Sequence, residues 1–178
     1  MKRSKEVLTP RQMLLVDDDP NDIVLFAAAI DQTGLDITLQ TAVDGRQAIE
    51  RLESRGKYAN RSVYPIPDLV LLDLTMSTRD GFDFLAWRRA SRWFTLPVFL
   101  YTGSQDKALI QRALTLGANR YIAKPHRFED LKSLVWDIYN SALKPHLGHE
   151  VASLNAVFSP AIRRTPVVPG GEFSPPVE

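Results

Sequence analysis

The stretch LVLLDLTMSTRDG (69–81) decides the fold, because four apolar residues lead directly into Asp73 and a turn sequence with Gly81 follows. A continuous apolar run of this length is typical of a strand buried on both faces of a parallel sheet. The earlier stretch QMLLVDDDP (12–20) repeats the pattern, with an apolar run that ends in three aspartates. Both stretches therefore predict inner strands whose carboxyl ends carry acids.

Outward from these two stretches, predicted strands and helices alternate as far as residue 142. The predicted strands span 12–16, 36–42, 69–73, 97–101 and 120–123. The predicted helices span about 20–32, 44–55, 105–116 and 127–142, with one more after the 77–81 turn that contains Phe82, Phe84, Leu85 and Trp87. Residues 56–67 are rich in turn formers and predict a loop. The alternation implies a mostly parallel α/β sheet covered on both faces.

The composition excludes several classes of protein. Among the 178 residues there is no Cys, which excludes disulfides, thiolate nucleophiles and Cys-based zinc sites. The net charge of +1 gives no bulk attraction to nucleic acid or lipid, so we expect neither as a partner. The apolar runs are too short to cross a bilayer, and we expect a cytoplasmic protein. We divide the chain into an N-terminal extension (1–10), one domain (11–142) and a Pro-rich C-terminal extension (143–178) without a separate domain.

Polar side chains follow several of the predicted strands. Asp17 and Asp18 follow the first strand, Asp73 the third, Thr102 the fourth and Lys124 the fifth. Because the carboxyl ends of parallel strands share one edge of the sheet, these groups can converge. Neighbouring carboxylates repel unless a cation lies between them, and Mg²⁺ with oxygen ligands meets that need. Carboxylate, dication, ammonium and hydroxyl together suit a phosphoryl group.

Four motifs in register, LLVDDDP, LVLLDLTMSTRDG, VFLYTGS and RYIAKP, resemble the receiver domain of two-component response regulators. The resemblance covers about residues 10–142. It implies a flavodoxin-like (βα)5 doubly wound parallel sheet with strand order 2-1-3-4-5. It also implies a phosphoacceptor that is served by a sensor histidine kinase or a phosphotransfer protein. The long insertion at 56–67 resembles that of stand-alone regulators that partner bacterial phytochrome kinases.

The resemblance implies a role for each polar residue. Asp73 would be the nucleophile that becomes an aspartyl phosphate, Thr102 would hydrogen-bond the phosphoryl oxygens, and Lys124 would pair with the phosphoryl group. Tyr121 would be the aromatic switch residue that turns inward when Thr102 moves. The metal ligands would be Asp17, Asp18, Asp73 and the backbone carbonyl of Thr75.

Two details around these motifs concern the backbone. The peptide between Lys124 and Pro125 is usually cis in the family that the chain resembles. Ser77 stands four residues after Asp73, where the family often has proline. Since Gly81 is retained, we expect the turn to form but the loop after Asp73 to be more mobile.

The function expected from the sequence is a single-domain response regulator. It would signal by docking onto an unknown downstream protein or by passing the phosphoryl group along a relay, and its only catalysis would be its own phosphorylation and dephosphorylation. The sequence leaves open whether the chain forms a homodimer. A phosphorylation-independent adaptor is the alternative. A phosphohydrolase of the haloacid dehalogenase type is disfavoured, because Thr75 stands where that family needs a second acid.

Two further groups of residues have simple structural explanations. Arg88, Arg89 and Arg92 lie close to Trp87 and Trp93, and the sequence favours a solvated helix face over a nucleic-acid patch. His146 and His149 are predicted to lie in a solvent-exposed stretch rather than to bind metal.

Overall fold

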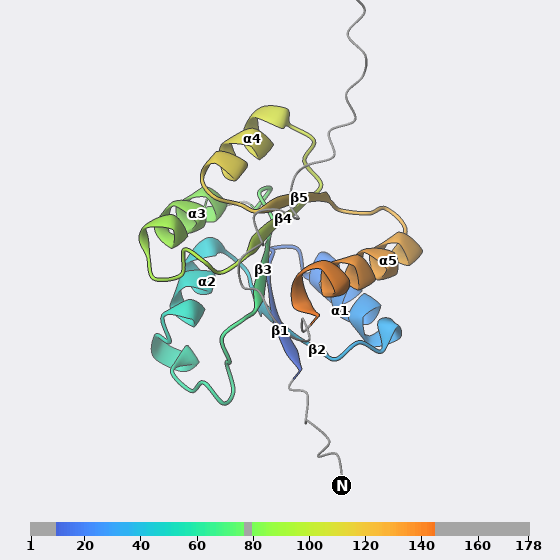
Figure 1. Cartoon of the computed structure of the whole chain (residues 1–178), viewed down its shortest axis with the longest axis horizontal. Helices are drawn as coiled ribbons and strands as arrows, with labels where there is room; N and C mark the ends of the chain where they lie inside the picture. Colours follow the sequence, from blue (N-terminus) through green and yellow to red (C-terminus); the bar gives the residue numbers. More distant parts are fainter. Residues whose placement is uncertain (1–9, 77–79, 145–178) are drawn as a thin grey trace, which may run out of the picture. The chain divides into compact units, whose positions relative to one another are not determined.

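A computed structural model describes residues 10–76 and 80–144 of the chain (Figure 1). The strands are β1 (Arg11–Val16), β2 (Ile37–Ala42), β3 (Leu69–Leu72), β4 (Val98–Thr102) and β5 (Arg120–Ala123). The helices are α1 (Pro20–Thr33), α2 (Gly45–Leu52), α3 (Asp80–Ala90), α4 (Lys107–Thr115) and α5 (Phe128–Ile138), and a π-helical turn (Tyr139–Leu143) follows α5. The predicted order of elements is confirmed, and the predicted ends differ by a few residues.

All five strands are parallel and follow the order β2-β1-β3-β4-β5, which confirms the flavodoxin-like doubly wound fold. Every residue of β3 is buried, as the unbroken apolar sequence of this strand predicts. Helices α1 and α5 pack together on one face of the sheet, and α2, α3 and α4 lie on the other (Figure 1). The strand order reverses between β1 and β3, so the carboxyl ends of these two strands form the crevice where such folds bind ligands.

Helix α1 begins and ends as its sequence predicts. The Asp19 carboxylate accepts a hydrogen bond of 2.8 Å from the Asn21 amide, and Pro20 occupies the first helical position. The helix ends at Gly34, whose φ of +65° favours glycine. Asp19 is therefore the N-cap of α1.

The insertion at 56–67 is anchored to α2 and contains a short 3₁₀ turn (Gly56–Tyr58). The Arg61 guanidinium donates hydrogen bonds to the carbonyl oxygens of Arg51 and Leu52 at 3.0 and 2.6 Å. The Arg51 guanidinium lies over two tyrosine rings, 4.7 Å from the centroid of Tyr58 and 5.0 Å from that of Tyr64. The predicted loop thus has specific contacts that close the last turn of α2.

The prediction that Arg88 belongs to a solvated helix face is wrong. Arg88 is only 4% exposed, and its guanidinium donates hydrogen bonds to the carbonyl oxygens of Leu96 and Gly117 at 2.7 and 3.0 Å. A third contact reaches Asn119 Oδ1 at 3.5 Å. The segments that lead into β4 and β5 carry these acceptors, and an arginine fork can satisfy several of them at once.

Other sequence expectations concern one peptide bond, membrane-spanning helices and residues outside the described ranges. The described residues contain no cis peptide, so Lys124–Pro125 is trans, the intrinsically favoured form, and the cis expectation is wrong. Within the same residues, no helix combines the length and apolar character needed to span a membrane. The expectations for residues 1–9, for Ser77 and for the C-terminal extension beyond Lys144, including His146 and His149, lie outside the described residues.

Candidate functional site

Backbone hydrogen bonds fix the polar residues at the carboxyl ends of the central strands. The Asp73 amide donates to the Val16 carbonyl at 2.9 Å, and the Lys124 amide donates to the Thr102 carbonyl at 3.0 Å. Asp17, Asp73 and Thr102 are at most 2% exposed, although each carries a polar side chain. The sheet register therefore holds the side chains of Asp17, Asp73 and Lys124, from three strand ends, close to one another, and Thr102 lies at the end of the fourth.

Lys124 lies among three carboxylates. Its Nζ is 2.5 Å from Asp22 Oδ2, 2.7 Å from Asp73 Oδ2 and 2.8 Å from Asp17 Oδ2. It donates hydrogen bonds to Asp22 and Asp73. Oδ2 of Asp17 is within ion-pair distance but accepts no hydrogen bond. The lysine thus faces the acids, and one buried carboxylate oxygen keeps unused acceptor capacity.

Thr75 covers the other side of the Asp73 carboxylate. Its amide and its hydroxyl donate to Asp73 Oδ1 at 2.8 and 2.7 Å, and the hydroxyl also lies 2.9 Å from Oδ2. The sequence assigned only the Thr75 carbonyl to the site, so these two donors are an addition. Gly81 lies so close that a Cβ there would be 3.2 Å from the Asp73 carbonyl oxygen, which explains why a glycine follows this strand.

The two buried acids titrate differently because their hydrogen bonds differ. Burial acts to raise the pKa of Asp73, but hydrogen bonds from Lys124 and Thr75 outweigh it and hold that pKa below its usual value. Burial raises the pKa of Asp17, and its ion pair with Lys124 and the hydrogen bond from the Asp19 amide do not compensate. For Lys124, the three carboxylates outweigh burial and raise its pKa. Asp73 and Lys124 are therefore both ionised at neutral pH.

Thr102 and Tyr121 meet at Ser104 rather than at Asp73. The Ser104 amide donates to the Thr102 hydroxyl at 3.2 Å, and the Tyr121 hydroxyl donates to the Ser104 carbonyl at 3.1 Å. Thr102 is buried and Tyr121 is half-buried. The two residues predicted to form a switch thus share a hydrogen-bonded neighbour, and no hydrogen bond joins Thr102 to the Asp73 carboxylate.

Sequence reasoning missed Asp22. Its carboxylate reaches Lys124 across 102 positions of sequence, and nothing in the local pattern of α1 distinguishes it from an ordinary acid in the first turn. Asp18, in contrast, is exposed at the edge of the acid cluster. Only the tertiary structure, which brings the first turn of α1 to Lys124 just after β5, reveals the partner of Asp22.

The donor set at the strand ends fits a small hard cation. Among the described residues, no three His, Cys, Asp or Glu side chains form a ready-made metal cluster, and the Lys124 ammonium lies between the acids instead. The buried Asp17 Oδ2 nevertheless has no hydrogen-bond donor, and the acids outnumber the lysine. Carboxylate and carbonyl oxygens are the ligands that Mg²⁺ prefers. Asp17, Asp18, Asp73 and the Thr75 carbonyl could hold such an ion.

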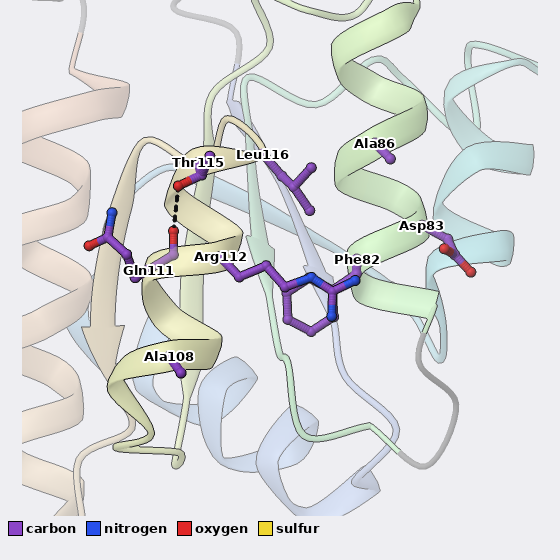
Figure 2. Close-up of a pocket in the computed structure, with 8 residues that line it drawn as sticks. All are labelled: Phe82, Asp83, Ala86, Ala108, Gln111, Arg112, Thr115 and Leu116. Atoms are coloured by element: carbon purple, nitrogen blue, oxygen red, sulfur yellow. Dashed lines mark hydrogen bonds between the residues drawn. The ribbon is translucent and has the colours of Figure 1, made fainter.

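A separate cavity lies between α3 and α4 (Figure 2). It has a volume of about 470 Å³. Arg112 of α4 extends toward Phe82 of α3, and its guanidinium carbon lies 4.3 Å from the centre of that ring. Asp83 is the only acid among its lining residues, and none of them belongs to the strand-end site.

The known proteins described next, which are similar to this chain, are response regulators, and the matching family model is that of their receiver domain. A family model described as "Response regulator receiver domain" matches residues 13–136. Response regulator Rcp1 of Synechocystis sp. is 30% identical over 136 residues, covering 76% of this chain and 90% of that protein. The phosphorylated cyanobacterial phytochrome response regulator RcpA superposes with a TM-score of 0.68 at 29% identity, covering 76% of this chain and 95% of the other. The Mn²⁺-bound form of Rcp1 gives a TM-score of 0.66 at 27% identity, with 79% and 100% coverage.

Proposed function

This chain belongs to the response regulator receiver family, and from that premise we propose that it accepts one phosphoryl group on Asp73. The donor would be a sensor histidine kinase or a phosphotransfer protein. One observation carries the proposal: the ionised, buried Asp73 carboxylate lies 2.7 Å from the Lys124 ammonium and is oriented by two donors of Thr75. Members of this family are signalling domains rather than ordinary enzymes.

The transfer itself requires little from the protein beyond positioning and charge. An Asp73 carboxylate oxygen attacks phosphorus, and a P–O bond forms as the P–N bond of the donor phosphohistidine breaks. The imidazole leaves with the electron pair and takes up a proton from water. Asp73 needs no general base, because its lowered pKa keeps it ionised. Lys124 neutralises the phosphoryl oxygens, and the Thr75 donors fix the direction in which the carboxylate faces.

We propose Mg²⁺ as the resident cation, held by Asp17, Asp18, Asp73 and the Thr75 carbonyl. When bound, Mg²⁺ would neutralise charge on the phosphoryl oxygens during transfer. The donors are hard oxygens, and Asp17 Oδ2 forms an ion pair with Lys124 but accepts no hydrogen bond, so a cation can compete for it. For this ion to bind, Lys124 must give up at least its contact with Asp17.

Phosphorylation of Asp73 would change the surface that the protein presents to its partners. Once phosphorylated, Asp73 presents oxygens that can accept a hydrogen bond from the Thr102 hydroxyl and draw it away from the Ser104 amide. This would free Ser104, whose carbonyl now holds the Tyr121 hydroxyl, to move. We propose that a downstream protein or the next member of a relay reads this change. The signalling unit would be residues 11–142, acting in the cytoplasm, with 1–10 and 143–178 as extensions.

Uptake of the phosphoryl group can be tested with acetyl phosphate and Mg²⁺ on the whole chain. Intact-mass measurement should show the gain of one phosphoryl group by the native protein and none by Asp73→Asn. Chelation of the metal should prevent the gain. Equal labelling of Asp73→Asn would contradict the assignment of Asp73, and the absence of labelling in the native protein would favour the phosphorylation-independent adaptor.

A further inference from the structure

We propose that Asp22 is a positioning residue that keeps Lys124 in place while the cation binds Asp17 and the phosphoryl group is attached to Asp73. This inference rests on the proposed phosphoacceptor function and adds a residue to it. The observation is the contact between Asp22 Oδ2 and Lys124 Nζ at 2.5 Å, which joins the first turn of α1 to the end of β5.

The ordinary role of an acid in the first helical turn does not explain Asp22. An acid at this third helical position often reaches back to the backbone amide of the cap residue. Here the Asp19 amide donates to Asp17 Oδ1 at 3.0 Å, and the Asp19 carboxylate already caps the Asn21 amide. The cap is complete without Asp22, whose carboxylate instead contacts a side chain 102 positions away.

The three acids around Lys124 would have different roles in the proposed reaction. Asp17 would bind the cation, and its Oδ2 is the oxygen without a hydrogen bond. Asp73 would carry the phosphoryl group, so its oxygen loses the charge that now attracts the ammonium. Asp22 has neither task, and only its contact with Lys124 can persist through every step of the transfer.

Exposure supports the same division of roles. The side chains of Asp17 and Asp73 are 0% and 3% exposed, whereas that of Asp22 is 31% exposed. A partly hydrated carboxylate can hold the ammonium without the large desolvation cost of a fully buried charge. Because a lysine is a point charge on a flexible four-carbon stem, a fixed outer partner limits where its ammonium can move.

The proposal predicts a separation of two kinetic quantities. The acids assigned to the cation remain in Asp22→Ala, so the Mg²⁺ concentration for half-maximal phosphorylation should change by less than about twofold. The maximal rate with acetyl phosphate should fall by about tenfold, the factor that about 1.4 kcal/mol of lost transition-state stabilisation gives. Asp22→Glu keeps the carboxylate and should recover most of the rate.

Asp31→Ala is the matched control. It removes the same charge from an exposed position in the last turn of the same helix, about 13 Å along the axis from Asp22. Its rate and its Mg²⁺ dependence should match those of the native protein. If Asp31→Ala and Asp22→Ala were equally slow, or if the rate of Asp22→Ala were unchanged, Asp22 would have no positioning role.

A second readout needs no phosphodonor. In a ¹H–¹⁵N spectrum of lysine ammonium groups recorded with saturating Mg²⁺, the signal of Lys124 should persist in the native protein and in Asp31→Ala and be lost in Asp22→Ala. Persistence of this signal in Asp22→Ala would overturn the proposal. If the native protein took up no phosphoryl group while the signal still depended on Asp22, the phosphoacceptor function would fail and the Asp22–Lys124 tether would remain.

Discussion

Replacement of Lys124 by methionine tests the electrostatics of the site most directly. Lys124→Met keeps the length of the aliphatic stem but removes the ammonium that now contacts three carboxylates. Without a divalent cation, the acids would face one another with no compensating charge. We therefore expect the metal-free protein to lose stability at neutral pH.

The expected loss follows from burial. The Lys124 side chain is 14% exposed and its partners Asp17 and Asp73 are 0% and 3% exposed, so this is a buried ion pair. Removing one partner of such a pair costs about 3–5 kcal/mol. Protonation limits the loss, because a carboxylate of pKa about 4 can be neutralised at pH 7 for about 4 kcal/mol. We expect about 3 kcal/mol and a melting temperature lower by about 10 °C.

The assay is urea and thermal unfolding in the presence of a chelator, at pH 7 and at pH 5. In Lys124→Met the folded acids have raised pKa values, so the variant loses stability as the pH rises through them and regains it as the pH falls. Its deficit relative to the native protein should therefore shrink at pH 5. Added Mg²⁺ should also restore stability, by about 2.7 kcal/mol at a hundred times its Kd.

Two further variants make the result specific. Lys132→Met removes a lysine whose pair with Glu129 on α5 is partly exposed, and this change should cost less than about 1 kcal/mol. Asp17→Asn added to Lys124→Met should recover part of the lost stability, because Asp17 is the acid whose pKa burial raises. If Lys124→Met were as stable as the native protein at pH 7 without metal, or if its deficit did not shrink at pH 5, the reasoning would be refuted.

Two other predictions concern Asp73 and Arg88. Thr75→Val removes the hydroxyl that contacts both oxygens of Asp73, so the pKa of Asp73 should rise. Acid unfolding should then begin at a higher pH, and about 1 kcal/mol of stability should be lost at neutral pH. An unchanged Asp73 pKa in a carboxyl NMR titration would contradict this. Arg88→Lys should lower the free energy of unfolding in urea by about 3 kcal/mol, since lysine cannot reach all the acceptors of the guanidinium. Arg89 is exposed and its guanidinium donates one hydrogen bond, to the Thr115 carbonyl, so Arg89→Lys should cost little. Equal losses from the two arginine changes would show that burial of Arg88 is unimportant.

The Arg88 result illustrates where sequence reasoning fails. The sequence in and just after α3 places three arginines near two tryptophans, and nothing in the local spacing separates the buried arginine from the others. Arg88 is buried because its acceptors, Leu96, Gly117 and Asn119, come from segments up to 31 positions away. The role of Asp22 was missed for the same reason, since its partner Lys124 lies just after the last strand, 102 positions away.

The sequence by itself determined the layered α/β fold, the order of its elements and the strand ends at which Asp17, Asp73 and Lys124 lie. Apolar runs and turn residues encode these features locally, and the parallel sheet then leaves one edge for its polar ends. Only the tertiary structure decided how the charges pair: Lys124 forms ion pairs with three acids, Thr75 contacts both oxygens of Asp73, and Asp17 Oδ2 has an ion pair but no hydrogen bond. Pairing depends on distances of a few tenths of an ångström between residues far apart in sequence, and no local pattern carries that information.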